Sequence, residues 1–462
     1  MRLPAGEDHP DEEIVLAALR SLPGAEATLF FHLLGCRRCA ARARIELQPT
    51  AAGPGGIRAP ARALGIEYDG VLSRREIAVG RMVAEIARRR AAAEWQVAKL
   101  EAAPPESHAG LILQAAREDA WATAAVLLEL SRAALPGDPP RAEALARLAA
   151  VAAAEMDAAG QPVPAAELQS EVACQVAEAC RLGGGLERAE EELARAAAHL
   201  DDAVDGIGRG QFRAGLARLR RDQRRWDEAL ALFARAADLF ERHGNGLDAA
   251  VALGDKGKLE LRMWEPAEAW ESFELAASLV PRGPVALALG LQRGLALTCA
   301  LENHIPQAWQ ILAAASRRFP PEPGSREDLE LTLVGGELSE SEGDLRGAEQ
   351  KVAAAFQGFL ALGEWHAAAI AGLHVARLLL AAGSTVRLER LMADMTPVFA
   401  APGMSSAVLD ALGRFRLAVA GKAARVPLAS AVLDYLKVAR GNPSLPFDAS
   451  GIADAVAKLK SR

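Results

Sequence analysis

Four residues near the N-terminus have the types and the spacing of a zinc site. His32, Cys36 and Cys39 form an H-x3-C-x2-C pattern in a segment over 25–47 that begins apolar and ends basic. Positions i, i+4 and i+7 of a helix lie on one face, so the imidazole and the two thiols would converge there. Structural zinc takes four nitrogen or sulfur ligands in a tetrahedron. His9 is the nearest further histidine or cysteine.

The segment after His9 can bring this fourth ligand close to the other three. His9 and Pro10 precede three acidic residues, an arrangement typical of a helix N-terminus. A helix over 11–22 would end at the turn formed by Pro23 and Gly24 and fold back on the helix that carries the cysteines. Four protein ligands leave no open position for a reacting water, so we expect one structural zinc ion (Zn2+) per chain.

Other interpretations of these cysteines remain open. Two cysteines on an apolar helix are often small buried hydrophobic residues, and the pair could also serve redox chemistry or mark a site that has lost its metal. The chain has five cysteines, an odd number in a sequence without an export signal, which argues against a disulfide framework. Cys174, Cys180 and Cys299 have no histidine at a metal spacing, and we expect them in the core.

The H-x22-H-x3-C-x2-C layout within residues 1–47 resembles the zinc-binding anti-sigma domain. The resemblance implies that His9, His32, Cys36 and Cys39 are the metal ligands, and that this small helical module docks on a sigma factor. The metal would supply much of the folding free energy of so short a module. Apolar residues over 30–34 exceed what the module can bury by itself, so we expect it to dock on the N-terminal end of the solenoid described below or to bind a partner.

A repeat fills most of the remaining chain. Each copy has an alanine, a bulky apolar residue four positions later and a small or apolar residue three positions after that, which together form one face of a helix. The first residues of successive copies are separated by 40, 40, 39, 40 and 40 residues. The copies are Ala189/Leu193/Ala196, Ala229/Phe233/Ala236, Ala269/Phe273/Ala276, Ala308/Leu312/Ala315, Ala348/Val352/Ala355 and the degenerate Leu388/Met392/Met395.

The surroundings of each copy indicate a helix-turn-helix unit. A turn and another amphipathic helix precede the copies, and Pro281 and Pro320 follow two of them at the same offset, where a helix must stop. These residues resemble tetratricopeptide repeats (TPR), whose second helix carries the same Ala, Phe or Leu, Ala and terminal Pro pattern. The resemblance implies an all-α, TPR-like α-solenoid. The standard unit has about 34 residues, so the longer period requires longer helices or longer loops between repeats.

The patterns divide the chain into five parts, an arrangement similar to that of a group of uncharacterised bacterial repeat proteins. The parts are a helical zinc-binding module (1–47), a Pro/Gly-rich linker (48–66), a basic connecting helix (67–106), TPR-like repeats (107–405), and capping helices with a polar tail (406–462). At the start of the repeats we expect a degenerate helix pair centred on Ala144, Leu148 and Val151.

The composition favours helix and excludes several classes of function. Hydrophobic residues make up 51% of the chain with alanine dominant, and aromatic residues only 5%, a mixture that favours helix over strand. The formal net charge of -7 provides no general attraction to nucleic acid. The most apolar stretch, 367–382, contains His374 and Arg377 and indicates a packed helix, not a membrane span. We therefore expect a cytoplasmic protein.

These observations favour a non-enzymatic scaffold that binds a protein or peptide partner in the groove of the solenoid. The sequence contains no nucleophile elbow, zincin motif or kinase motif set. We expect the tryptophans near the repeat turns to be packing residues, among them Trp226, Trp264, Trp270, Trp309 and Trp365.

The alternative function is a nucleic-acid-associated transcription regulator that uses its arginine-rich surfaces. The densest run contains Arg218, Arg220, Arg221, Arg224 and Arg225. Acidic residues lie beside this run, so we interpret it as a solvated helix end. Arginines along one continuous face would favour nucleic acid, whereas arginines alternating with carboxylates would favour a protein partner.

Overall fold

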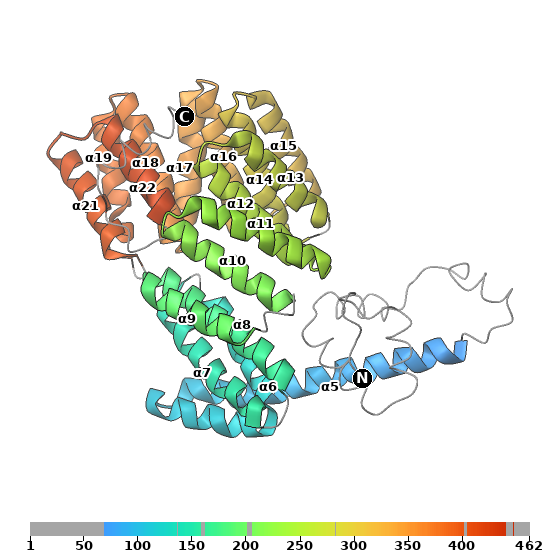
Figure 1. Ribbon diagram of the computed structural model, residues 1–462. Coiled ribbons are helices and arrows are strands. Elements are labelled where there is room, and N and C mark those ends of the chain that lie inside the picture. The colour runs from blue at the N-terminus through green and yellow to red at the C-terminus, as the bar shows by residue number, and fades with distance from the viewer. Residues whose placement is uncertain are drawn as a thin grey trace, which may run out of the picture.

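The computed structural model describes residues 69–135, 137–158, 162–200, 206–281, 283–401, 404–439 and 447 (Figure 1). Every regular element within these ranges is a helix, and the ranges contain no strand. This result confirms the all-α prediction. His9, His32, Cys36 and Cys39 lie outside the described residues, as does the expected linker over 48–66.

Three long helices precede the regular repeats. They are α5 (Asp69–Ala98), α6 (His108–Ala134) and α7 (Pro139–Ala158), with the short 3-10 helices η1 (Lys99–Ala102) and η2 (Pro105–Ser107) between α5 and α6. Arg89 of α5 pairs with Asp119 of α6, where the backbone departs from helical geometry inside α6. Figure 1 shows that the N-terminal part of α5 projects beyond α6.

Six helix pairs follow, each with a first and a second helix. The first helices are α8 (Pro162–Leu182), α10 (Ile207–Asp222), α12 (Gly246–Arg262), α14 (Val285–Leu301), α16 (Arg326–Ser341) and α18 (Trp365–Ala381). The second helices are α9 (Leu186–Ala198), α11 (Trp226–Arg242), α13 (Pro266–Leu279), α15 (Ile305–Arg318), α17 (Leu345–Ala361) and α19 (Thr385–Asp394). A short α20 (Thr396–Phe399) leads to a last pair, α21 (Ser406–Ala420) and α22 (Val426–Ala439).

The pairs stack into a solenoid with two layers. At three of the five junctions between successive pairs the first helices pack on one another: α8 on α10, α12 on α14, and α14 on α16. Successive second helices have no comparable contact at any junction. Neighbouring elements approach more closely on the inside of a curved stack than on its outside. The first helices therefore form the inner layer and the second helices the outer layer.

The repeat motif forms the seam between the two layers. All eighteen positions of the six copies, from Ala189 to Met395, are buried, and none is more than 8% exposed. The alanines allow the helices to approach closely, and the bulky middle residues, such as Phe233 and Phe273, fill the space between them. The predicted repeat register is confirmed.

A left-handed residue ends each first helix of the six pairs. These residues are Gly184, Arg224, Trp264, Asn303, Gly343 and Gly383, at the same place in every unit. At the second of these turns, the N–H of Arg225 donates to the carbonyl of Arg220 at 2.9 Å and that of Arg224 to Arg221 at 3.1 Å, the two bonds of a Schellman motif. The motif reverses the chain in three residues.

The period of about 40 residues has two sources. Most helices of the repeats have 16 or 17 residues, as in α10, α11 and α12. The second helices α13 and α15 have only 14 residues because Pro281 and Pro320 follow them. The residues before these prolines, Val280 and Phe319, leave the helical region at φ -129°. Longer helices and, after α13 and α15, longer loops thus both extend the unit.

The expected register of α7 is wrong. Ala144 is exposed, and Leu148 and Val151 are only half-buried. The fully buried face consists instead of Ala142, Ala146, Ala149, Ala152 and Ala153. Alanine occurs on several sides of α7, so its apolar pattern specifies no single face.

Candidate interaction surface

The inner layer carries a column of charged side chains. Counting six residues back from each left-handed turn residue reaches one position in each first helix. These positions are Glu178, Arg218, Lys258, Leu297, Glu337 and Arg377, and we call them the inner column. Five of the six are charged and both signs occur. A core-facing position would be apolar, so the column belongs to the open side of the inner layer.

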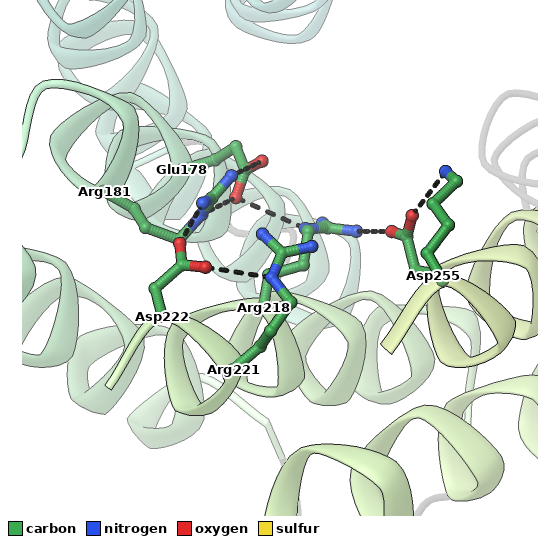
Figure 2. A network of polar contacts seen from close by, with 7 residues as sticks. Glu178, Arg181, Arg218, Arg221, Asp222 and Asp255 are labelled. Atoms are coloured by element: carbon green, nitrogen blue, oxygen red, sulfur yellow. Dashed lines mark hydrogen bonds and ion pairs between the residues drawn. The ribbon is translucent and has the colours of Figure 1, made fainter. Parts of the chain in front are cut away.

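The N-terminal half of the column is part of an ion-pair network that joins α8, α10 and α12 (Figure 2). Arg181 of α8 pairs with Glu178 at 2.8 Å and also with Asp222 of α10. The side chains of Arg181 and Asp222 are only 5% and 2% exposed. A buried charge is tolerated only when it is paired, so these contacts fix α10 against α8.

Arg218 continues the network from α10 to α12. Its Nε atom donates to Oε2 of Glu178 at 3.3 Å, and its Nη1 atom lies 3.8 Å from Oδ2 of Asp255. Lys258 approaches the other oxygen of Asp255 at 3.0 Å. Figure 2 shows the side chains of three successive first helices converging in one row.

The network holds its carboxylates ionised. Burial by itself would raise the pKa of Glu178, but the charges of Arg181 and Arg218 outweigh it and lower that pKa far below its ordinary value. Burial also opposes ionisation of Asp255, and Lys258 and Arg218 likewise lower its pKa. The inner face therefore carries full charges at neutral pH.

A second network occupies the C-terminal half of the column. Nε2 of His374 in α18 lies 2.7 Å from Oε2 of Glu340 in α16, and Arg377 also pairs with Glu340. Nζ of Lys437 in α22 donates to Glu337 at 3.0 Å. The last helix of the described chain is thereby joined to α16, a hundred residues earlier in the sequence.

The arginine run on α10 is not a solvated helix end, contrary to the sequence interpretation. Arg218 and Arg221 are half-buried members of the network, and Arg220 contacts Glu190 of α9 at 2.8 Å. Arg224 and Arg225, at the turn, are exposed as expected. The arginines of the inner face are interspersed with carboxylates that pair with them, the arrangement that favours a protein partner over nucleic acid. Aligning the six repeats on their left-handed turn residues would have shown this charged column in the sequence.

Other residues noted in the sequence have structural roles. Cys180 and Cys299 are buried as expected, and burial raises the pKa of Cys180 to about 11, so it remains a thiol. Trp309 is half-buried against Lys351, with the ammonium 4.9 Å from the ring centre. Trp264 departs from the expectation because it is 39% exposed at its turn.

No group of three or more potential metal ligands occurs in the part of the chain that the structure describes. The four expected zinc ligands lie outside that part, so the zinc site stays a prediction. Among the described helices, none is long and apolar enough to cross a membrane.

The fold is an all-α, TPR-like α-solenoid. A Rap protein complexed with competence and sporulation factor is 14% identical, with a TM-score of 0.48, over 73% of this chain and 94% of the other. A signal transduction ATPase with numerous domains (STAND) from Pyrococcus horikoshii, which has a tetratricopeptide repeat sensor, is 14% identical with a TM-score of 0.46. The match covers 87% of this chain but 54% of the ATPase. No protein-family model and no curated protein matches the sequence.

Proposed function

We propose that the protein is a non-enzymatic scaffold that binds a segment of a protein or peptide partner along the inner column. The observation that carries this proposal is the regular line of charged side chains on the first helices. The repeat seam already supplies the core, so the column is not needed for packing between the layers and its charges remain on an open face. Solenoids present extended concave surfaces of this kind to extended chains.

The mixed signs of the column favour a protein partner. The acids Glu178 and Glu337 share the column with the cations Arg218, Lys258 and Arg377. A phosphate backbone would be repelled by these acids, whereas a peptide with both signs of charge can match them. Electrostatic complementarity of this type selects partners and sets their register.

The N-terminal module belongs to the same proposal. His9, His32, Cys36 and Cys39 would hold one structural zinc, and the module would dock on the solenoid or bind a second partner, such as a sigma factor. The support for this part is the spacing of the four residues and the resemblance to anti-sigma domains. The zinc would fix the fold of the module and leave its apolar surface for docking.

Affinity capture with matched charge reversals tests the scaffold function. Lys258 has a 61% exposed side chain, and Arg235 is exposed on α11, in the outer layer. We expect Lys258→Glu to lose partners that the wild-type protein retains, identified by mass spectrometry, and Arg235→Glu to keep them. Equal loss in both variants, or in neither, would contradict binding along the inner column.

A further inference from the structure

Arg262 is a half-buried cation at the edge of the ion-pair network. It is the last residue of α12 and lies on the same face of that helix as Asp255 and Lys258, at positions i, i+3 and i+7. It forms no hydrogen bond or ion pair with any residue that the structure describes. A guanidinium group has five N–H donors, and no described residue accepts a hydrogen bond from those of Arg262.

Arg221 of α10 supplies a second set of free donors beside it. Its Nε atom donates to Oδ1 of Asp222 at 2.9 Å, and its side chain is 15% exposed. Its two terminal nitrogens have no partner among the described residues. Figure 2 shows them pointing away from Asp222. Arg262 follows Arg221 by 41 residues, the same offset and the same places before the turn residues as in the contacting pair Arg181 and Asp222 one unit earlier, so the repeat places the two guanidinium groups next to each other. The positive charge of Arg221 also acts on Arg262.

The network holds five cations and only three anions. Its cations are Arg181, Arg218, Arg221, Lys258 and Arg262, and its anions are Glu178, Asp222 and Asp255. The two oxygens of Asp222 already contact Arg181 and Arg221, while Asp255 contacts Lys258 and Arg218. Burial and, next, the charge of Arg221 lower the pKa of Arg262 to about 10, and the charge of Asp222 opposes this shift without offsetting it.

The repeat itself does not require a cation at this position. The residues two places before the left-handed turn residue in the other five pairs are Leu182, Asp222, Leu301, Ser341 and Ala381. Arg262 is therefore specific to the third pair. An unpaired half-buried charge destabilises the free protein, and a bound anion would compensate this cost.

We infer that Arg221 and Arg262 form a binding site for an oxyanion, a carboxylate or phosphate carried by the partner. Guanidinium groups bind such planar or tetrahedral oxygen groups through two parallel N–H donors, with good geometric selectivity. The inference rests on the proposed function, since it assigns a chemical group of the partner to the third helix pair. A partner segment with both signs of charge would place its oxyanion at Arg221 and Arg262 and its cations against Glu178 or Glu337.

Small anions test the site without knowledge of the partner. The midpoint of thermal unfolding is followed as inorganic phosphate or acetate replaces chloride at constant ionic strength. A ligand that binds only the folded state raises this midpoint in a saturable manner. The proteins compared are the wild type, Arg262→Gln, Arg221→Gln and, as a control for charge, Arg235→Gln on the outer layer.

We expect a saturable rise for the wild type and for Arg235→Gln. In Arg262→Gln and Arg221→Gln the apparent affinity should fall by about tenfold or more, the effect of losing a charge-assisted hydrogen bond. Arg262→Gln should also have a higher midpoint than the wild type when no binding anion is present. A rise that is unsaturable and equal in all four proteins is a general salt effect and would overturn the inference.

The two probes distinguish the source of the oxyanion. Saturation at lower concentrations of acetate than of phosphate assigns the site to a carboxylate, and the reverse order assigns it to a phosphate group. The result also separates this inference from the proposed function. If Arg262→Gln loses anion binding but Lys258→Glu still captures the same partners, only the scaffold proposal is wrong. If Arg262→Gln binds anions as the wild type does but Lys258→Glu loses the partners, only the anion site is wrong.

Discussion

The ring of Phe273 in α13 occupies the space that a side chain on Gly294 in α14 would need. A Cβ atom at residue 294 would lie 2.6 Å from Cζ of Phe273, well inside any real contact distance. Phe273 is completely buried and is the middle residue of its repeat motif. The bulky position of one pair thus packs on a glycine in the first helix of the next, which brings the two pairs together.

Gly294→Ala is therefore expected to destabilise the protein. The added methyl group would displace a buried ring, which costs about 1–3 kcal/mol. Gly290 is a control in the same helix, because a Cβ atom there would meet nothing within 4 Å. Gly290→Ala should raise the free energy of unfolding by about 0.5–1 kcal/mol. Urea unfolding of both variants would show opposite signs, and equal effects would contradict the packing described here.

Arg224 should be replaceable by glycine with a gain in stability. Its φ is 63°, in the left-handed region that costs a side-chain-bearing residue about 1–2 kcal/mol, part of which the greater freedom of glycine in the unfolded state offsets. Arg225 follows it with φ -89°, where glycine has no advantage. Thermal unfolding should therefore rank Arg224→Gly above the wild type and Arg225→Gly below it. The reverse ranking would rule out strain at this turn.

Glu340 should make the stability of the C-terminal pairs depend on acidic pH. Burial opposes its ionisation, but hydrogen bonds from His374 and Arg377 outweigh this effect and lower its pKa to about 2 from an ordinary 4.5. A lowered carboxyl pKa adds stability that is complete above about pH 4.5 and is lost as the pH falls toward 2.

The measurement is the free energy of unfolding of wild type and Glu340→Gln between these pH values. The difference between the two proteins should shrink as the solution becomes more acidic. Glu271 is an exposed residue on α13 and serves as the control. A constant difference for Glu340→Gln would show that its ion pairs do not set this pH dependence.

Replacing both Cys36 and Cys39 by serine should abolish zinc binding. Elemental analysis of the purified wild-type protein is expected to give close to one zinc per chain, since His9 and His32 complete a set of four ligands. Hydrogen exchange in the double variant should increase only over 1–47, because the solenoid has its own core. Carefully reconstituted wild-type protein that contains no zinc would eliminate the site.

The sequence sufficed for the seam of the solenoid because that seam depends on neighbouring residues in one helix. Ala229, Phe233 and Ala236 lie on one face by helical geometry alone, and the same face recurs in each unit. The prediction of the buried face of α7 was wrong because it relied on the same local pattern. Where alanine occurs on every side, as around Ala144, the pattern cannot indicate which face will be buried.

The inner column could not be derived in the same way. Arg218 and Asp255 are 37 residues apart, and Arg181 and Asp222 are 41 apart, so their pairing depends on the packing of successive first helices. The charges on α10 would follow the same local pattern in a solvated helix end and in an inner-face network, so the pattern does not distinguish the two. The column becomes visible in the sequence only when all units are aligned on their turn residues. The burial of Arg262 beside Arg221 could not be predicted from the sequence and is seen only in the structure.

Site-specific photo-crosslinking in the native cell tests the binding of a partner along the inner column most directly. A photoreactive amino acid replaces Lys258 on α12 or, in the matched protein, Arg235 on α11, and the crosslinked products are identified by mass spectrometry. Position 258 is expected to give a discrete crosslinked partner whose peptide carries acidic or phosphorylated side chains, and position 235 to give none. Crosslinking of that partner from position 235 with none from position 258 would contradict the account.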